Sequence, residues 1–225
     1  MVTTQELLGP LTDLERKHSP AFLYVQGPMG LPLGHPRVAI VGTRTPSPEG
    51  LAFARKVAEY LATRGVTIVS GLARGVDTAA HTAVIKSGGK TIAVLGTPLS
   101  RSYPKENTTL QATIGSRFLL VSQFAEGPPV QQHNFVMRNR TMAVIADTSV
   151  IIESGDGGGS LHQGWEALRL GRPLYIHSRE FTKPGLKWPG EMERYGAVRF
   201  DDPGEILESL PSPGFTSAVA ALDPA

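Results

Sequence analysis

Three short turns in this sequence carry the chemical groups with which proteins bind phosphate. The turns are Gly42-Thr43-Arg44, Ser70-Gly71-Leu72-Ala73-Arg74-Gly75 and Gly157-Gly158-Gly159-Ser160, and each comes after an apolar run. Glycine leaves backbone N–H groups accessible, and hydroxyl and guanidinium groups donate hydrogen bonds to oxyanions. No obvious pair of nucleophile and base accompanies these turns. They therefore indicate anion binding and predict no catalytic residue.

A further basic segment, Arg138-Asn139-Arg140, comes just before the strand that leads to the glycine-rich turn. Residues 135–143 have the pattern of a helix, on which Arg138 and Arg140 lie about 200° apart. Both can serve one site only if one of them lies at an irregular end. Taken alone, Arg44 could be a solvated loop residue, and the glycines of the last turn could provide flexibility alone.

The elements that must position these turns alternate between strands and helices. Strands are predicted at 38–41, 66–70, 91–96, 117–122, 148–152 and 173–176, with helical segments between most of them. This spacing predicts right-handed βαβ units, and hence an α/β protein with a mostly parallel sheet and helices on both faces. Because the carboxyl ends of parallel strands share one edge, the turns are expected to meet at one cleft.

Two predicted helices have a capping residue at the expected start. Ser47 is predicted to cap a helix that begins at Pro48 and ends near Arg64, and Asp77 is predicted to cap the next one. His81 lies one turn into that second helix, where no second histidine or carboxylate stands at metal-ligand spacing. We therefore expect His81 to make a structural hydrogen bond, and we expect no metal and no cofactor.

The length of 225 residues suits one large α/β domain with short extensions. We expect an N-terminal extension over 1–36, a core domain over 37–210 and a flexible tail over 211–225. Within the extension, the apolar run 21–25 predicts an edge strand.

Composition excludes several classes of protein. There is no cysteine, which excludes disulfides, thiolate metal sites and a cysteine nucleophile. No segment approaches roughly 18 uninterrupted apolar residues, the length of a membrane-spanning helix, and the N-terminus lacks the pattern of an export signal. We therefore expect a cytoplasmic protein without membrane contact.

Charge is distributed unevenly along the chain. The formal net charge is only +2, but residues 37–140 hold 13 Lys and Arg against 5 Asp and Glu. A basic segment of this kind is typical of a protein that binds a polyanion. Arg55, Lys56 and Arg64 lie on a predicted helix, however, and could simply form its solvated face.

Five strings in this order closely resemble the DNA-processing protein A family, also called Smf or DprA, over about residues 37–178. The strings are Val38–Arg44, Val69–His81, Thr91–Gly96, Tyr103–Asn107 and Arg138–Arg140. The resemblance implies an extended Rossmann-like domain that binds single-stranded DNA and forms a homodimer. It also implies that the strand is handed to a RecA-type recombinase during natural transformation.

The resemblance also implies roles for individual residues. Arg44 is similar to the family's phosphate-contacting arginine, Arg74 to the arginine of its second turn, and Arg138–Arg140 to its basic pocket wall. Phe135 is similar to an aromatic residue that stacks on a base. The expected set of DNA- or phosphate-binding residues is Gly42, Thr43, Arg44, Ser70, Gly71, Arg74, Lys105, Phe135, Arg138, Asn139, Arg140, Gly158, Gly159 and Ser160.

The sequence departs from the family pattern at several places. Gly159-Ser160 stands where the family usually has Ser-Gly-Ser, and Gln123 follows Ser122 where a glutamate is usual. The helical and winged-helix modules of longer members are expected to be missing. These departures concern recombinase loading more than DNA binding.

Residues 138–160 also resemble the lysine-decarboxylase-like phosphoribohydrolases, which suggests an alternative. In that family a lysine stands at the position of Asn139 and the catalytic glutamate at that of Gln163. Without the carboxylate, cleavage of an N-glycosidic bond loses its acid–base group, although Glu153 or Glu166 could substitute. We therefore expect a binding protein, and we keep a nucleotide-binding sensor and a phosphoribohydrolase as alternatives.

Overall fold

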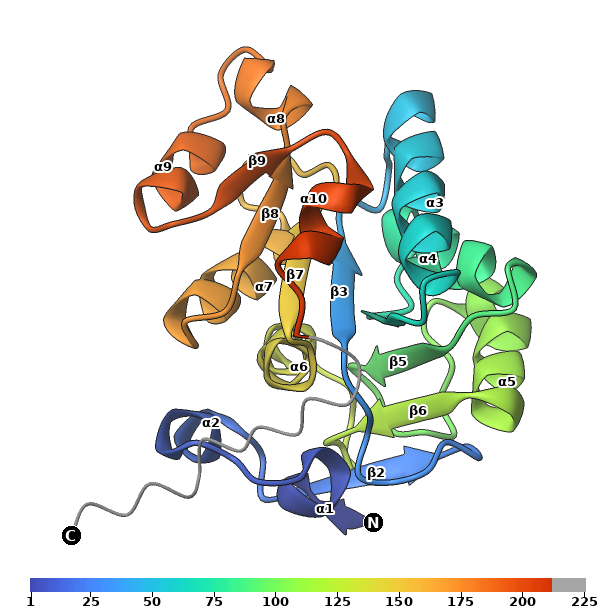
Figure 1. Cartoon of the computed structure of the whole chain (residues 1–225). Coiled ribbons are helices and arrows are strands. Elements are labelled where there is room, and N and C mark those ends of the chain that lie inside the picture. Colours follow the sequence, from blue (N-terminus) through green and yellow to red (C-terminus); the bar gives the residue numbers. More distant parts are fainter. Residues whose placement is uncertain (212–225) are drawn as a thin grey trace, which may run out of the picture.

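The computed structural model describes residues 1–211, whose strands form one nine-stranded sheet (Figure 1). The strands are β1 (Val2–Thr3), β2 (Phe22–Gln26), β3 (Arg37–Val41), β4 (Thr67–Ser70), β5 (Thr91–Leu95), β6 (Leu119–Ser122), β7 (Thr148–Ile151), β8 (Leu174–His177) and β9 (Val198–Phe200). Their order is β1-β2-β6-β5-β4-β3-β7-β8-β9. The pairings among β3 to β9 are parallel, and those of β1 with β2 and of β2 with β6 are antiparallel. The mostly parallel sheet predicted from the sequence is confirmed.

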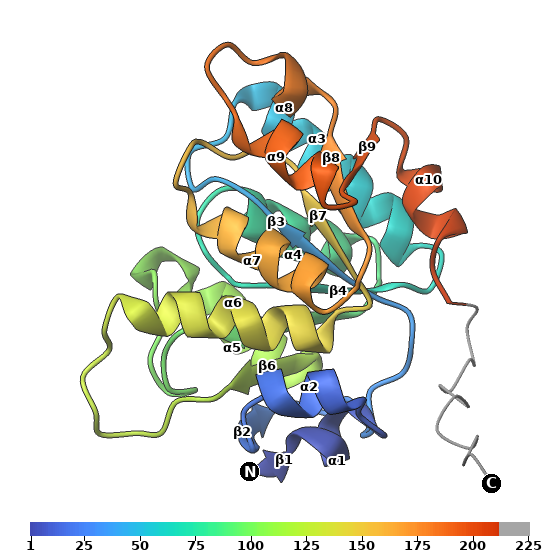
Figure 2. The ribbon, with the colours of Figure 1, turned by 90° about the vertical axis from the view of Figure 1, so that its left-hand side faces the viewer.

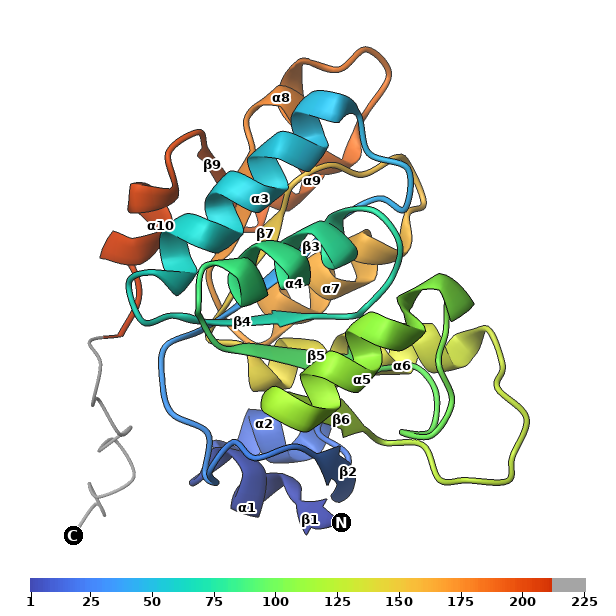
Figure 3. The same ribbon diagram turned by 90° about the vertical axis from the view of Figure 1, so that its right-hand side faces the viewer.

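Helices cover both faces of this sheet. The helices are α1 (Thr4–Leu8), α2 (Asp13–His18), α3 (Pro48–Ala62), α4 (Val76–Lys86), α5 (Thr108–Arg117), α6 (His133–Ile145), α7 (Gly159–Arg169), α8 (Arg179–Thr182), α9 (Trp188–Arg194) and α10 (Pro203–Glu208), with a short 3-10 turn at Lys105–Asn107. Figure 2 shows α6 and α7 on one face of the sheet, and Figure 3 shows α3, α4 and α5 on the other. Because both faces are covered, the central strands are buried along their whole length and not only at alternate positions.

Strand β3 and helix α3 form the first βα unit, with the boundaries that the sequence indicates. All five residues of β3 are buried. The Ser47 side chain caps α3 by accepting a hydrogen bond from the Gly50 N–H at 3.0 Å, and Pro48 is the first helical residue. The predicted cap is therefore confirmed. The helix ends at Ala62, two residues before the predicted end.

The start of α4 differs from the prediction. Helix α4 begins at Val76, and its N-cap is Gly75, whose φ of 74° lies in the left-handed region. Asp77 is not the cap. Its carboxylate accepts hydrogen bonds from the N–H groups of Gly71 (3.1 Å) and Ala73 (3.2 Å), which belong to the preceding turn. The prediction was wrong because a side chain just inside a helix can serve the loop before the helix as well as the helix end.

The strand order reverses direction next to β3. From β3 the chain proceeds through β4, β5 and β6 on one side, and then returns to place β7 and β8 on the other side. The helices that follow β3 and β7 consequently cover opposite faces, as Figures 2 and 3 show. In open α/β sheets a crevice forms at the carboxyl ends of the strands at such a switch point. The turns that follow β3 and β7 both end there.

The N-terminal segment is joined to the same sheet. Strand β2 pairs with β6, and the two-residue β1 pairs with the outer side of β2. The run 21–25 therefore forms the strand next to the edge and not the edge itself.

Of the tail predicted for 211–225, everything after Pro211 lies outside the described residues. Within residues 1–211, no helix has the length and apolar character needed to cross a membrane.

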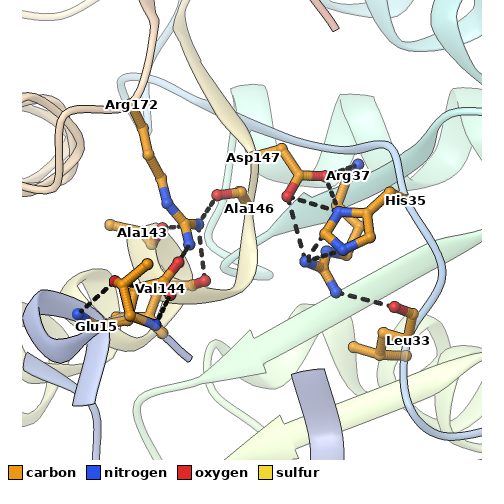
Figure 4. Close-up of polar contacts among 10 residues, drawn as sticks. Glu15, Leu33, His35, Arg37, Ala143, Val144, Ala146, Asp147 and Arg172 are labelled. Atoms are coloured by element: carbon orange, nitrogen blue, oxygen red, sulfur yellow. Dashed lines mark hydrogen bonds and ion pairs between the residues drawn. The ribbon is translucent and has the colours of Figure 1, made fainter. Parts of the chain in front are cut away.

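Charged side chains fasten this N-terminal segment to the sheet at the edge opposite the crevice (Figure 4). Arg172 donates hydrogen bonds to the carbonyls of Ala143 and Val144 at 2.7 Å each and pairs with Glu15 of α2 at 2.5 Å. Asp147 accepts hydrogen bonds from the backbone N–H of Arg37 at 2.7 Å and from its guanidinium at 3.2 Å. These contacts join α2, the end of α6 and the beginning of β3.

His81 has the structural role expected from the sequence. Its Nδ1 lies 2.7 Å from the hydroxyl of Thr91, which itself donates to the carbonyl of Ile68. Nδ1 must therefore carry the ring proton. Burial, and then the nearby positive charge of Arg138, lowers the pKa of His81 to about 3.

This lowered pKa predicts a dependence of stability on pH. Histidine in an unfolded chain has a pKa of about 6.5, so the unfolded state takes up a proton below this pH and the folded state does not. Between about pH 6 and pH 4, His81 alone should reduce the free energy of unfolding by about 1.4 kcal/mol per pH unit as the pH falls. Urea unfolding at several pH values measures the slope. The variant His81→Gln should lose this part of it, whereas His133→Gln, on the surface, should keep the wild-type slope.

Candidate functional site

The crevice at the switch point consists of two adjoining cavities, which we together call the cleft. The first cavity, of about 540 Å³, lies between the carboxyl end of β3, the loop after β7 and helix α6. The second, of about 470 Å³, lies between the turn after β4 and the segment 101–106. Three predicted site residues, Arg44, Phe135 and Arg138, line both cavities. The turns thus meet at one edge of the sheet, as the sequence predicted.

The structure brings most of the predicted site residues to this cleft. In addition to the three shared residues, the first cavity is lined by Gly42, Asn139, Gly159 and Ser160, and the second by Gly71, Arg74 and Lys105. The other predicted residues, Thr43, Ser70, Arg140 and Gly158, line neither cavity.

These residues have other contacts, and those of three side chains explain their absence from the cleft. The Ser70 hydroxyl is fully buried and donates to the carbonyl of Ile40 at 2.7 Å. The Thr43 hydroxyl accepts a hydrogen bond from the N–H of Thr45 at 3.2 Å. Arg140 pairs with Glu166 at 3.1 Å, on a different side of α6 from Arg138, as their separation on the helix requires. Arg138 and Arg140 therefore do not form one basic wall.

Exposed cations surround the cleft. Arg44, Arg101 and Lys105 are exposed and line one or both cavities. In the part of the chain that the structure describes, none of them has a carboxylate within ion-pair distance. Arg74 is also exposed but pairs with Glu106. The charges of Arg44, Arg101 and Lys105 therefore face solvent, and an anion that enters the cleft meets them directly.

Aromatic rings lie among these cations. The rings of Tyr103 and Phe135 have centroids 5.1 Å apart, and the guanidinium carbon of Arg44 lies 6.0 Å from the centroid of Phe135. The backbone at Gly96 packs against Phe135 so closely that a Cβ there would lie 2.5 Å from the ring. The ring of Phe135 thus packs against the backbone of Gly96, while the side chain of Tyr103 is about half exposed.

Neither Arg101 nor Tyr103 is recognisable from the sequence as a site residue. Both lie in the loop between β5 and α5, and the packing of this loop brings them to the cleft. The one available signal is that Tyr103 begins the string Tyr103–Asn107. This signal is weak, because a tyrosine can equally serve as a packed aromatic side chain without contacting a ligand.

Buried charges hold the turn that carries Arg74. Arg138 donates hydrogen bonds to the carbonyls of Val94 (2.9 Å) and Gly71. Asp77 binds the N–H groups of the same turn. Burial raises the pKa of Asp77 and lowers that of Arg138, and each effect is opposed by the charge of the other residue. The two buried side chains are thus held by hydrogen bonds to the turn after β4 and, for Arg138, also to strand β5.

The glycine-rich turn leads directly into α7. The helix begins at Gly159, two residues earlier than predicted, and no side chain caps it. Asn139 donates to the carbonyl of Gly159 at 2.8 Å, and the hydroxyl of Ser160 lies 2.7 Å from that of Ser154. The positive end of the helix dipole therefore meets the first cavity, an arrangement that favours an anion.

The carboxylates considered for catalysis lie elsewhere. Glu153 accepts hydrogen bonds from Ser47 and pairs with Lys183 at 3.0 Å, and Glu166 pairs with Arg140; neither lines the cleft. Gln163, at the position of the phosphoribohydrolase glutamate, is fully buried. Among residues 1–211, no three His, Cys, Asp or Glu side chains are arranged to hold a metal ion.

Comparison with known proteins identifies the family. Residues 5–211 match the family model of DNA recombination-mediator protein A. The chain belongs to this family. Protein Smf of Escherichia coli is 36% identical over 192 residues, which cover 85% of this chain and 51% of that protein. The chain thus spans about half the length of this relative, and 55% of the DNA processing protein DprA of Streptococcus pneumoniae.

Solved structures of other family members have the same fold. DNA processing protein A from Streptococcus pneumoniae superposes with a TM-score of 0.77 at 32% identity, covering 92% of this chain and 77% of that one. The protein from Helicobacter pylori, solved to describe its single-stranded DNA binding mode, has a TM-score of 0.73 at 26% identity. That comparison covers 83% of this chain and 85% of the other. The Rossmann-like architecture expected from the resemblance is therefore that of the family.

The burial of Asp77 predicts a large effect of changing its charge. Asp77→Asn keeps the volume of the side chain but removes the negative charge that opposes the desolvation of Arg138. We expect a loss of about 1–3 kcal/mol in the free energy of unfolding at pH 7, the range for disturbing a buried polar group and its hydrogen bonds. Urea denaturation measures this loss. Asp156→Asn, which changes an exposed residue of the glycine-rich loop, should have almost no effect, and equal losses in the two variants would contradict the role of Asp77.

Proposed function

We propose that this protein binds single-stranded DNA without base specificity, with the strand lying along the cleft. The observation that supports this most directly is the row of exposed cations, Arg44, Arg101 and Lys105, beside the rings of Tyr103 and Phe135. Cations that follow the sugar–phosphate backbone and aromatic rings that stack on bases are the two elements of sequence-independent single-strand binding. The structure of the Helicobacter pylori relative adds support.

In this proposal each part of the cleft has a distinct task. The N–H groups at the start of α7, with the guanidinium of Arg44, receive a phosphate in the first cavity. Arg74, Arg101 and Lys105 receive the backbone in the second cavity. Phe135, placed between the cavities, offers its face to a base. Arg138 acts indirectly, because its hydrogen bonds hold the turn of Arg74.

Assembly and partners form a further part of the proposal. The resemblance to the DprA family suggests a cytoplasmic homodimer that passes single-stranded DNA to a RecA-type recombinase. The family model, described as a recombination mediator, supports this view. Size-exclusion chromatography with light scattering tests the dimer, and a pull-down with a purified RecA-type protein tests the hand-over.

We also propose that the cleft binds nucleic acid without chemical turnover. Its lining carboxylates are Asp77, whose oxygen is used by two backbone N–H groups, and Glu106, which pairs with Arg74. Neither stands at the position of the phosphoribohydrolase glutamate, which is Gln163 here. Cleavage of an N-glycosidic bond would therefore lack the acid–base group that it needs.

The proposal predicts a salt-dependent affinity to which Arg44 contributes. For single strands, the logarithm of the binding constant should fall by about 0.7 for each phosphate neutralised per tenfold rise in salt. Arg44→Ala should weaken binding of all sequences alike by about 1–3 kcal/mol and reduce the salt slope by about 0.7. Fluorescence anisotropy with a labelled oligothymidylate at several salt concentrations measures both quantities.

The matched control is Arg117→Ala. Arg117 is an exposed arginine of the same basic segment, but it lies at the end of α5 and lines neither cavity. Its loss should leave affinity and slope close to those of the wild type. An Arg44→Ala variant that unfolds at a lower temperature instead, with unchanged affinity, would assign Arg44 a structural role.

The absence of turnover is tested separately. Incubation with each common nucleoside monophosphate should release no free base, as measured by liquid chromatography. If base is released and Glu153→Gln or Glu166→Gln abolishes the release, the phosphoribohydrolase alternative replaces DNA binding. If a mononucleotide binds tightly and oligonucleotides do not compete, the protein is a nucleotide sensor.

A further inference from the structure

The second cavity contains one negatively charged side chain, which is unfavourable in a site for DNA. Its charged lining residues, among those that the structure describes, are the cations Arg44, Arg74, Arg101, Lys105 and Arg138 and the single carboxylate Glu106. A carboxylate beside a phosphate repels it, so Glu106 reduces the affinity of this cavity for any polyanion unless it has a compensating use.

Glu106 forms an ion pair with Arg74. The side chains of these residues are 48% and 62% exposed, so the pair lies at the mouth of the cavity and not in its interior. The hydrogen bond between them, with their opposite charges, raises the pKa of Arg74 and lowers that of Glu106. Both groups are therefore ionised at neutral pH, and the charge of Arg74 is already balanced before a ligand arrives.

The two partners are presented to each other by a fixed framework. Asn107, next to Glu106, is buried and donates hydrogen bonds to the carbonyl of Leu72 at 2.9 Å and to the hydroxyl of Thr78 at 2.8 Å. These bonds tie the 3-10 turn of Glu106 to the turn of Arg74. The backbones are thus held together, while the two paired side chains lie exposed to solvent and to any ligand that enters the cavity.

We propose that Glu106 is a built-in competitor that occupies Arg74 and is displaced by a phosphate of the bound strand. This inference rests on the proposed function of the cleft. A carboxylate and a phosphate both bind guanidinium through paired oxygens, so one can replace the other with little change in geometry. The exchange lowers the net affinity and so favours release of the strand.

The competitor also changes the salt dependence. Because Arg74 is balanced by Glu106, a phosphate that takes over Arg74 leaves a carboxylate that needs a counterion. The favourable release of one counterion from DNA is then largely cancelled by the counterion that the carboxylate of Glu106 takes up. Without Glu106, the same contact adds a full increment of about 0.7 to the slope of log K against log salt.

The test is the variant Glu106→Gln, measured by anisotropy with the same labelled oligothymidylate. We expect binding about two- to fivefold tighter at low salt, the range for a lost exposed ion pair. We also expect a salt slope steeper by up to about 0.7. Circular dichroism should show an unchanged fold, since Glu106 is exposed.

Two further variants isolate the Arg74 contact. Glu59→Gln removes the same charge from the exposed surface of α3, away from the cleft, and should give neither the gain nor the steeper slope. In Glu106→Gln combined with Arg74→Ala, the gain should disappear, because the competitor acts only through Arg74.

Each other outcome overturns the inference in a recognisable way. Weaker binding by Glu106→Gln would mean that Glu106 orients Arg74 toward the strand, and unchanged binding would mean that Arg74 receives no phosphate. A similar gain in Glu59→Gln would reduce the effect to overall charge. In these cases the wild type still binds oligothymidylate, and the proposed function stands. Failure of the wild type to bind would overturn both proposals.

Discussion

The cleft depends on a guanidinium that is removed from water. Arg138 reaches from α6 across the end of the sheet and donates to carbonyls of the turn after β4 and of β5. Taking a charge out of water is costly, and these hydrogen bonds together with the nearby carboxylate of Asp77 offset the cost. Gly71 is the residue that this contact requires, because a Cβ there would overlap the guanidinium of Arg138. One helix and two strand ends are thus locked into a single arrangement.

The basic residues of this protein divide into two groups by burial. Arg37, Arg138 and Arg172 are mostly buried and hydrogen-bonded to protein groups, so they hold elements together. At the edge shown in Figure 4, burial alone would raise the pKa of Asp147, but the hydrogen bond from His35 and the charge of Arg37 outweigh it, and the pKa is lowered. Arg44 and its exposed neighbours in the cleft instead face solvent. The excess of positive charge in residues 37–140 is therefore only partly available to a ligand.

The arrangement of the cleft follows from the strand order. Because β7 lies on the opposite side of β3 from β4, the turns after these three strands surround one opening. Helix α6 lines that opening and contributes Phe135 and Arg138, one helical turn apart, to both cavities. Rigid elements thus position the aromatic ring, whereas exposed loop residues supply the cations. Such a division suits the recognition of a flexible strand, whose backbone can follow exposed cations while a base stacks on a ring held by a helix.

Much of this molecule could be predicted from local sequence, because local chemistry determines it. Apolar runs that end in glycine mark buried strands and their turns, and Ser47 followed by Pro48 marks the start of α3. These signals involve residues a few positions apart, so they can be recognised without knowing the fold. The opposite directions of Arg138 and Arg140 also follow from helix geometry alone. Which of the two faces the cleft does not, because that depends on how α6 packs.

Only the tertiary structure decided the roles that depend on distant partners. Asp77 could equally have capped its own helix, and its use by the preceding turn depends on where Arg138, 61 positions later in the sequence, comes to lie. Arg101 and Tyr103 enter the cleft because a loop folds over it, and Glu106 meets Arg74 because Asn107 ties two turns together. The physical reason is the same in each case. The sequence determines which groups a residue offers, but burial and the partner that meets it determine whether a charge supports the fold or remains available to a ligand.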